Sequence, residues 1–142
     1  DNKMKIGIVV ANYYPKISKD LLNGAKKILI ENKIKNFKVF TAPGVFEIPV
    51  IIAKNIKSFD AFVALGCVIK GQTPHFKFIS EAVTQSIMKI SVDRKKPIGN
   101  GIITCLNLNQ ALARSNPRKN NKGIEATTAV LSVLGIIKNE LK

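Results

Sequence analysis

Four short apolar runs rich in β-branched residues recur along the chain, separated by longer segments of mixed polarity. They cover residues 5–11, 37–41, 61–65 and 97–104. A parallel strand that is buried on both faces is apolar at nearly every position, so the runs predict four strands of that kind. The fourth contains Gly99 and Gly101, which weaken it as a strand.

The segments between these runs carry helical patterns. In residues 19–32 the apolar side chains recur at the spacing of one helix face, and they are Leu21, Leu22, Ala25, Ile28 and Leu29. Further helices are predicted at residues 46–56 with Pro49 in the first turn, from 76 onward, from 108 to about 115, and at 123–141.

Side chains that cap helix N-termini are expected at Ser18, Thr73 and Asn107. After Thr73, Pro74 suits the first helical position, which puts His75 in the first turn. The order strand-helix, repeated four times, predicts an α/β fold: a four-stranded parallel sheet with helices on both faces.

Unusual residues follow three of the predicted strands. Tyr13 and Tyr14 follow the first, residues 43–47 follow the second, and residues 66–76 follow the third. In sheets of this kind ligands bind beyond the carboxyl ends of the strands. The sequence therefore predicts a ligand site at that edge.

The length of 142 residues fits one domain, residues 1–142. No apolar run reaches the ~20 residues of a membrane span, and the first residues lack a signal-peptide pattern, so we expect a cytoplasmic protein. The net charge of +14 raises the hypothesis of nucleic-acid binding. However, 20 of the 23 basic residues are scattered lysines, whereas proteins that recognise nucleic-acid bases favour arginine. We therefore expect the positive surface to attract anionic small molecules rather than nucleic acid.

His75 is the only histidine of the chain, and it lies at a strand-to-helix junction, where an imidazole can transfer protons near pH 7. Cys67 and His75 could form a nucleophile–base pair, but no orienting group follows at a fixed place, so a buried structural Cys67 is preferred.

Residues 66–73 nearly match a P-loop, but Gln72 stands where that motif requires lysine. Backbone amides of residues 71–73 remain suited to one phosphate.

Four further residues have both a structural and a functional interpretation. Glu47 either complements a helix dipole or accepts hydrogen bonds from substrate hydroxyls. Tyr13 is either a core aromatic or a stacking surface for a planar ring. Arg114 closes a predicted helix, where a cation stabilises the C-terminus. Lys122 opens the last predicted helix, and a cation at a helix N-terminus is unfavourable unless an anion is bound there.

Three motifs together carry a resemblance that extends over nearly the whole chain. They read PGVFEIP at residues 43–49, GCVIKGQTPHF at 66–76 and NKGIEA at 121–126. In this order and spacing they resemble 6,7-dimethyl-8-ribityllumazine synthase, an enzyme family of riboflavin biosynthesis. The resemblance implies a flavodoxin-like three-layer αβα sandwich, no metal or organic cofactor, and active sites between the subunits of a homopentamer.

The resemblance also implies a reaction: 5-amino-6-(D-ribitylamino)uracil condenses with 3,4-dihydroxy-2-butanone 4-phosphate, releasing the lumazine, phosphate and water. His75 would be the acid–base group. The implied substrate-binding residues are Tyr13 on the pyrimidine, Val45, Phe46 and Glu47 around the ribityl chain, Cys67, Val68 and Ile69 on the uracil through backbone, and Gln72, Thr73, Arg114 and Lys122 at the phosphate. Arg114 and Lys122 would come from the neighbouring subunit.

Two departures from the family pattern stand out. Asn100 occupies a position where many relatives have an aromatic that covers the pyrimidine from across the interface. The uracil is then held more loosely or by a hydrogen bond. Only about four residues precede the first strand, which favours a free pentamer over a larger shell.

Three alternatives to this enzyme remain. A non-catalytic protein that binds flavin or lumazine would need neither His75 nor Arg114. A riboflavin-forming enzyme of the same fold would not need the phosphate contacts of Gln72, Thr73 and Arg114. A basic nucleic-acid binder would show steeply salt-dependent DNA affinity.

Overall fold

A parallel sheet forms the centre of the protein, whose computed structural model describes residues 3–72 and 74–136. The sheet has the strand order β2-β1-β3-β4, and its strands are β1 (Ile6–Ala11), β2 (Phe37–Ala42), β3 (Ala61–Ile69) and β4 (Ile98–Cys105). Each strand pairs in parallel with its neighbour. The predicted α/β class and parallel sheet are therefore confirmed.

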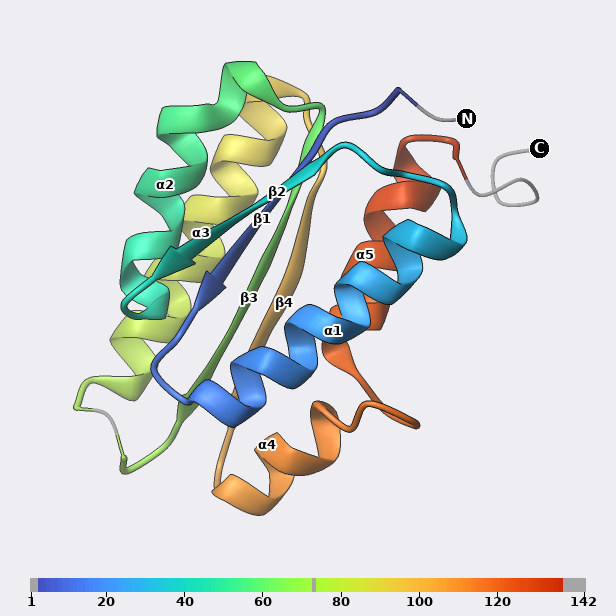
Figure 1. The fold of residues 1–142 in the computed structure, drawn as a ribbon. Helices are drawn as coiled ribbons and strands as arrows, with labels where there is room; N and C mark the ends of the chain where they lie inside the picture. Colours follow the sequence, from blue (N-terminus) through green and yellow to red (C-terminus); the bar gives the residue numbers. More distant parts are fainter. Residues whose placement is uncertain (1–2, 73, 137–142) are drawn as a thin grey trace.

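Helices cover both faces of the sheet, which gives three layers (Figure 1). One face carries α1 (Pro15–Glu31) and α5 (Lys122–Val133), and the other carries α2 (Ile48–Asn55) and α3 (Phe76–Arg94). The short helix α4 (Leu108–Arg114) lies near the carboxyl ends of the strands. Two 3₁₀ turns, Val45–Glu47 and Ile56–Ser58, flank α2.

The strands are apolar on both sides, so the protein has two cores. Alternate residues of β1 point to opposite faces: Ile6, Ile8 and Val10 join the core under α1 and α5, whereas Val9 and Ala11 join the core under α2 and α3. All nine residues of β3 are buried. This double burial explains why the strands read as continuous apolar runs.

The first helix begins earlier than the sequence predicted. It starts at Pro15, with Tyr14 at the N-cap, rather than at residue 19. The amide hydrogen of a residue in the first turn has no acceptor within the helix. Proline lacks this hydrogen and can therefore be the first residue of the helix. Ser18 therefore lies in the first turn, where its Oγ donates a hydrogen bond to the carbonyl of Ala11, and the predicted cap at Ser18 is wrong.

The third strand and the third helix also differ from the prediction. Gly66 does not end β3, which continues to Ile69 because its residues pair with β4 as far as Cys105. Helix α3 begins at Phe76 with His75 at the N-cap, so Pro74 is not its first residue. The predicted cap, Thr73, lies outside the described residues.

Two more predicted helices have different bounds. Residues 46–56 do not form one helix, because 3₁₀ turns precede and follow α2. The last helix ends at Val133, not near residue 141. Gly135 at φ 74° and the bond from the Ile136 amide to the Leu131 carbonyl, 3.0 Å, close its C-terminus. The predicted residues 137–141 lie outside the described part.

Candidate functional site

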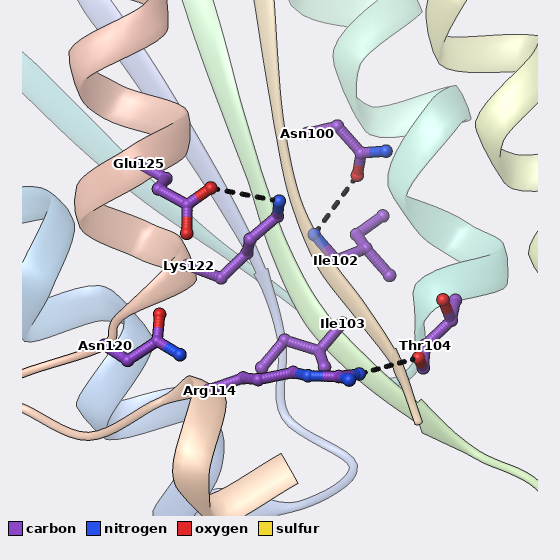
Figure 2. Close-up of a pocket in the computed structure, with 8 residues that line it drawn as sticks. All are labelled: Asn100, Ile102, Ile103, Thr104, Arg114, Asn120, Lys122 and Glu125. Atoms are coloured by element: carbon purple, nitrogen blue, oxygen red, sulfur yellow. Dashed lines mark hydrogen bonds and ion pairs between the residues drawn. The ribbon is translucent and has the colours of Figure 1, made fainter. Parts of the chain in front are cut away.

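Two cavities contain most of the site residues that the sequence predicted. The first, here called the aromatic cavity, lies at the carboxyl ends of β1, β2 and β3 and has a volume of about 290 Å³. Its lining comprises Tyr13, Pro43, Gly44, Val45, Phe46, Glu47, Cys67, Val68 and Ile79. The second, the cation cavity, lies beside β4 and measures about 500 Å³. It is lined by Asn100, Ile102, Ile103, Thr104, Arg114, Asn120, Lys122 and Glu125 (Figure 2).

A close approach of two backbone segments builds the aromatic cavity. A Cβ atom at Gly66 would lie 2.6 Å from Cγ1 of Val45, so only glycine lets the Val45–Glu47 turn settle onto β3. Val45 is buried there, and the next residue, Phe46, is 64% exposed. The buried valine therefore anchors the turn, while the phenylalanine ring faces the cavity and solvent.

Tyr13 lines the same cavity and follows β1, whose last residue is Ala11. It is 56% exposed, and its ring meets that of Tyr14 edge-on, with centroids 5.0 Å apart. Tyr13 is thus not a core residue, and one face of its ring is free to contact a planar ligand.

Glu47 is the only carboxylate that lines the aromatic cavity in the part of the chain that the structure describes. Among the described residues, none of the ion pairs involves Glu47. An unpaired carboxylate in a mainly apolar cavity is suited to accept hydrogen bonds from ligand hydroxyl groups.

Cys67 is a buried structural thiol, as the sequence analysis preferred. Burial, with smaller contributions from Cys105, raises the pKa of the Cys67 thiol to about 12. A thiol with so high a pKa stays protonated at neutral pH and is a poor nucleophile. Cys67 therefore offers shape and backbone groups to the cavity rather than covalent chemistry.

His75 lies on the same edge of the sheet, but it is not among the residues that line either cavity. It is exposed and has the left-handed conformation, φ 62° and ψ 31°, with its ring 6.2 Å from that of Phe78. Few non-glycine residues adopt positive φ, and such strain is concentrated at functional sites. The sequence could not reveal this backbone strain, which supports the functional role that the position of His75 at the strand-to-helix junction had suggested.

The segment before His75 does not begin a helix, as the sequence had suggested for residues 71–73. The Gln72 amide donates to the Ile69 carbonyl at 3.2 Å in a turn, and Gly71 has φ 80°. Ile69 is fully buried at the end of β3. The first-turn amides of α3 belong instead to residues 76–78, so the Gln72 amide must leave Ile69 before it can bind an anion.

Arg114 ends α4 and extends across the cation cavity to β4 (Figure 2). Its Nη1 donates to the Thr104 carbonyl at 3.4 Å and to Sγ of Cys105 at 3.6 Å. Within the described residues no ion pair includes Arg114. The guanidinium is thus held only by long contacts and keeps donors available for an anion.

Lys122 opens α5, as predicted, and its ammonium lies 3.4 Å from a carboxylate oxygen of Glu125. The pair is partly exposed, so solvent weakens it. Asn100 lies further along β4, where its Oδ1 accepts a hydrogen bond from the Ile102 amide at 3.1 Å. This bond uses one of the two acceptor positions of the oxygen, and among the described residues the NH₂ group donates no hydrogen bond to the protein.

The sequence did not predict several residues of the cation cavity, among them Thr104, Asn120 and Glu125. Glu125 lies in the NKGIEA motif but carries no signal that separates it from other surface glutamates. No group of three or more His, Cys, Asp or Glu side chains in residues 3–72 and 74–136 could hold a metal ion. No helix in this part is long and apolar enough to cross a membrane.

The parallel sheet, with a cavity at the carboxyl ends of its strands and a second one beside its edge strand, defines an α/β protein built to bind small molecules. The family model of 6,7-dimethyl-8-ribityllumazine synthase matches residues 3–138. The chain therefore belongs to this family, and it is an enzyme, a transferase of riboflavin biosynthesis.

Individual relatives agree with the family match. A 6,7-dimethyl-8-ribityllumazine synthase of Mycobacterium avium is 40% identical over 131 residues, which cover 91% of this chain and 82% of the relative. That of Arthrobacter sp. is 40% identical over 139 residues, 96% of this chain and 86% of the relative. That of Campylobacter jejuni is 35% identical over 142 residues, 97% and 92% of the two chains.

Proposed function

We propose that this chain condenses 5-amino-6-(D-ribitylamino)uracil with 3,4-dihydroxy-2-butanone 4-phosphate to give 6,7-dimethyl-8-ribityllumazine, inorganic phosphate and water. The match of the family model to residues 3–138 carries this proposal. The two cavities support it, because one offers an apolar surface for a planar ring and the other offers cations for a phosphate.

In this proposal the aromatic cavity binds the ribitylaminouracil. Tyr13 stacks on the pyrimidine, Val45 and Phe46 enclose the ribityl chain, and Glu47 accepts hydrogen bonds from its hydroxyls. The buried ends of β3, at Cys67, Val68 and Ile69, contact the uracil through backbone groups. The exposed rings of Tyr13 and Phe46 and the unpaired carboxylate of Glu47 support these roles.

The cation cavity, together with the turn before His75, binds the phosphate of the second substrate. Arg114 contributes a bidentate guanidinium, Lys122 a second positive charge, and Thr73 a main-chain donor. Gln72 contributes a second main-chain donor once its amide leaves the Ile69 carbonyl. The lack of a carboxylate partner on Arg114 among the described residues supports this role, since its charge is not already neutralised.

His75 moves protons between these two bound substrates. Imine formation, loss of phosphate and ring closure each require a proton to be taken from one atom and given to another, and an exposed imidazole at this edge of the sheet can do both. Its left-handed backbone holds the ring at the start of α3 rather than within the helix.

The active protein is a cytoplasmic homopentamer, with each site formed between two subunits. Among residues 3–72 and 74–136, no cation lines the aromatic cavity and no aromatic ring lines the cation cavity. Large apolar side chains exposed on α4, on α5 and beside both cavities support burial by a neighbouring subunit; they include Phe46, Leu106, Leu108, Leu112 and Val133. Asn100 then reaches the pyrimidine from the neighbour through its NH₂ group.

The direct test mixes the protein with both substrates, without added metal or nucleotide, and follows lumazine absorbance together with phosphate release. Equal amounts of lumazine and phosphate, well above the uncatalysed rate, are expected. Tight lumazine binding without turnover would instead support the non-catalytic binding protein.

Mixed oligomers test the shared site. Glu47→Ala and Arg114→Ala proteins, each weakly active alone, are co-refolded so that their subunits mix. A site between subunits restores activity, because some interfaces then carry both native cavities. Activity no higher than the average of the two variants would contradict a shared site.

A further inference from the structure

Asn121 is a buried polar residue to which the sequence analysis gave no role. It is 3% exposed, and its carboxamide takes part in four hydrogen bonds. Its Oδ1 accepts from the amides of Gly123, at 2.8 Å, and Ile124, at 3.1 Å. Its Nδ2 donates to the carbonyls of Asp20, at 3.0 Å, and Ser115, at 3.2 Å. All donor and acceptor positions that face the protein are thus used.

These bonds join the two segments that carry the cations of the cation cavity. Ser115, whose carbonyl Asn121 binds, directly follows Arg114, and it is itself buried, with its Oγ donating to the Ala111 carbonyl at 2.9 Å. Gly123 and Ile124, whose amides Asn121 caps, directly follow Lys122. The two segments also meet through a backbone bridge between Ser115 and Asn121 and a bond from the Asn116 amide to the Asn120 carbonyl, 3.1 Å. The Asn121 side chain adds to these contacts and helps to set the distance between the end of α4 and the start of α5.

The same side chain is anchored to α1 on its far side. The Asp20 carbonyl belongs to α1, and a Cβ atom at Gly24 of α1 would lie 2.3 Å from Oδ1 of Asn121. Gly123 approaches α1 as closely, since a Cβ there would lie 2.1 Å from the Leu21 carbonyl. Asn121 is packed against rigid backbone and has no room to adjust.

We propose that Asn121 is a positioning residue for phosphate binding: it holds Arg114 and Lys122 at the separation that one phosphate group requires. This role rests on the proposed function of the cation cavity. Arg114 makes only long contacts of its own, 3.4 Å and 3.6 Å, and hydrogen bonds of this length are weak. Its position therefore depends on the backbone that Asn121 fixes.

Asn121→Ser separates this role from simple capping of α5. Serine is a good N-cap and keeps a bond to the first-turn amides, but it is too short to reach the carbonyls of Asp20 and Ser115. We expect KM for the butanone phosphate to rise about tenfold, because a shift of about 1 Å can cost as much as ~100-fold. The value of kcat at saturation and KM for the uracil substrate stay within about twofold of wild type.

Asn107→Ser is the matched control. Asn107 is also a helix N-cap, accepting from the Gln110 amide at 2.9 Å, and it opens the helix that ends at Arg114. The same chemical change there keeps the cap and is expected to leave KM for the butanone phosphate unchanged.

Gly24→Ala provides a second route to the same effect. It displaces Asn121 from the α1 side and touches no cavity residue, while alanine favours the helix. We expect the same selective rise in KM for the phosphate substrate. Gly7→Ala, which crowds the ring of Phe62 at 2.6 Å on the other face of the sheet, controls for a clash at a buried glycine and is not expected to change this KM.

The outcomes are distinct. A selective rise in KM in both Asn121→Ser and Gly24→Ala supports the positioning role. A fall in kcat that follows the loss of folded protein, with KM unchanged, shows that Asn121 is only structural and overturns the positioning role. Wild-type values of kcat and KM in both variants overturn it as well. If wild type itself makes no lumazine, the proposed function fails, but the affinity of wild type and variants for inorganic phosphate, measured by calorimetry, still tests Asn121: equal affinities contradict the role.

Discussion

The two cavities of this chain differ in chemistry and in how the fold holds them. The aromatic cavity is formed by strand ends and one tight turn, and its shape depends on apolar packing, such as that of Val45 on Gly66. The cation cavity is formed by long side chains on an edge strand and two helix ends, and its shape depends on hydrogen bonds. Close packing of backbone and apolar side chains holds a surface in one shape. A long charged side chain is held in place only by hydrogen bonds or by the backbone segment that carries it.

This difference between the two cavities gives a physical reason for binding a ring and an anion on different segments of the chain. A ring-binding surface requires rigidity and low polarity. An anion site requires charges that remain solvated until the ligand arrives, because burying them unpaired is costly. Placing the two on different segments lets each meet its own condition, and in the proposed function a neighbouring subunit brings them together.

The largest expected effect concerns a residue that belongs to neither cavity. His75→Ala should lower kcat about 100-fold, the usual contribution of one acid–base group, with little change in either KM. Steady-state kinetics with each substrate varied in turn measures this. Unchanged turnover would remove His75 from the proton-transfer role and leave binding as its only function.

The next effect should be confined to the cation cavity. Arg114→Ala removes a charge-assisted contact to phosphate, and we expect KM for the butanone phosphate to rise about 30-fold, with KM for the uracil nearly unchanged. Arg118→Ala is the matched control, because Arg118 is exposed on the nearby loop and lines neither cavity. Equal losses for both substrates would contradict the division between the cavities.

A smaller effect should be confined to the aromatic cavity. Phe46→Ala removes an exposed ring from its wall, and KM for the uracil substrate should rise about tenfold while KM for the phosphate substrate stays constant. Met88→Ala serves as control, since Met88 is 63% exposed on α3 and lines neither cavity. A selective effect on the phosphate substrate would show that Phe46 has been assigned to the wrong ligand.

The smallest expected effect is on the pH dependence of the free energy of unfolding, and it differs between the thiols of Cys67 and Cys105, which lie near the two cavities. Because the folded pKa of Cys67 is about 12 and its ordinary value is 9.0, the unfolded thiol ionises first as pH rises. The free energy of unfolding should then fall with pH above about 9, by less than ~1.4 kcal/mol per pH unit. Urea denaturation should show a shallower fall for Cys67→Ala.

Cys105→Ala should change this pH dependence less. Burial raises the pKa of Cys105 as well, but the Arg114 guanidinium opposes that shift. Equal slopes for wild type and Cys67→Ala would show that Cys67 ionises in the folded protein as it does in the unfolded chain.

The sequence predicted the elements that depend on local chemistry. The four strands were evident because a doubly buried strand is apolar throughout, and the predicted cap at Asn107 is confirmed. For Tyr13 the sequence left a core role and a ligand-contact role open, and the structure shows that the ring is exposed. The helix starts were predicted less well. Ser18 was the predicted cap of α1, but the helix begins at Pro15, and the Ser18 hydroxyl instead donates to the Ala11 carbonyl of β1.

The candidate site divides in the same way. The sequence placed Tyr13, residues 43–47 and residues 66–76 at one edge of the sheet. The structure brings Tyr13, the Val45–Glu47 turn and Cys67 into one cavity there. The left-handed backbone of His75 and the engaged amide of Gln72 were not predictable, because both depend on how β3 extends to Ile69 before the chain turns.

The sequence by itself determined the order of strands and helices and the chemical types of the site residues, because these follow from local periodicity and from motifs. Only the tertiary structure decided that Asn121 joins α1, α4 and α5, that Gly66 admits Val45, and that the cations lie in a cavity separate from the aromatic rings. Such contacts join residues as far as 101 positions apart. Their geometry depends on how layers pack in three dimensions, which local patterns do not encode.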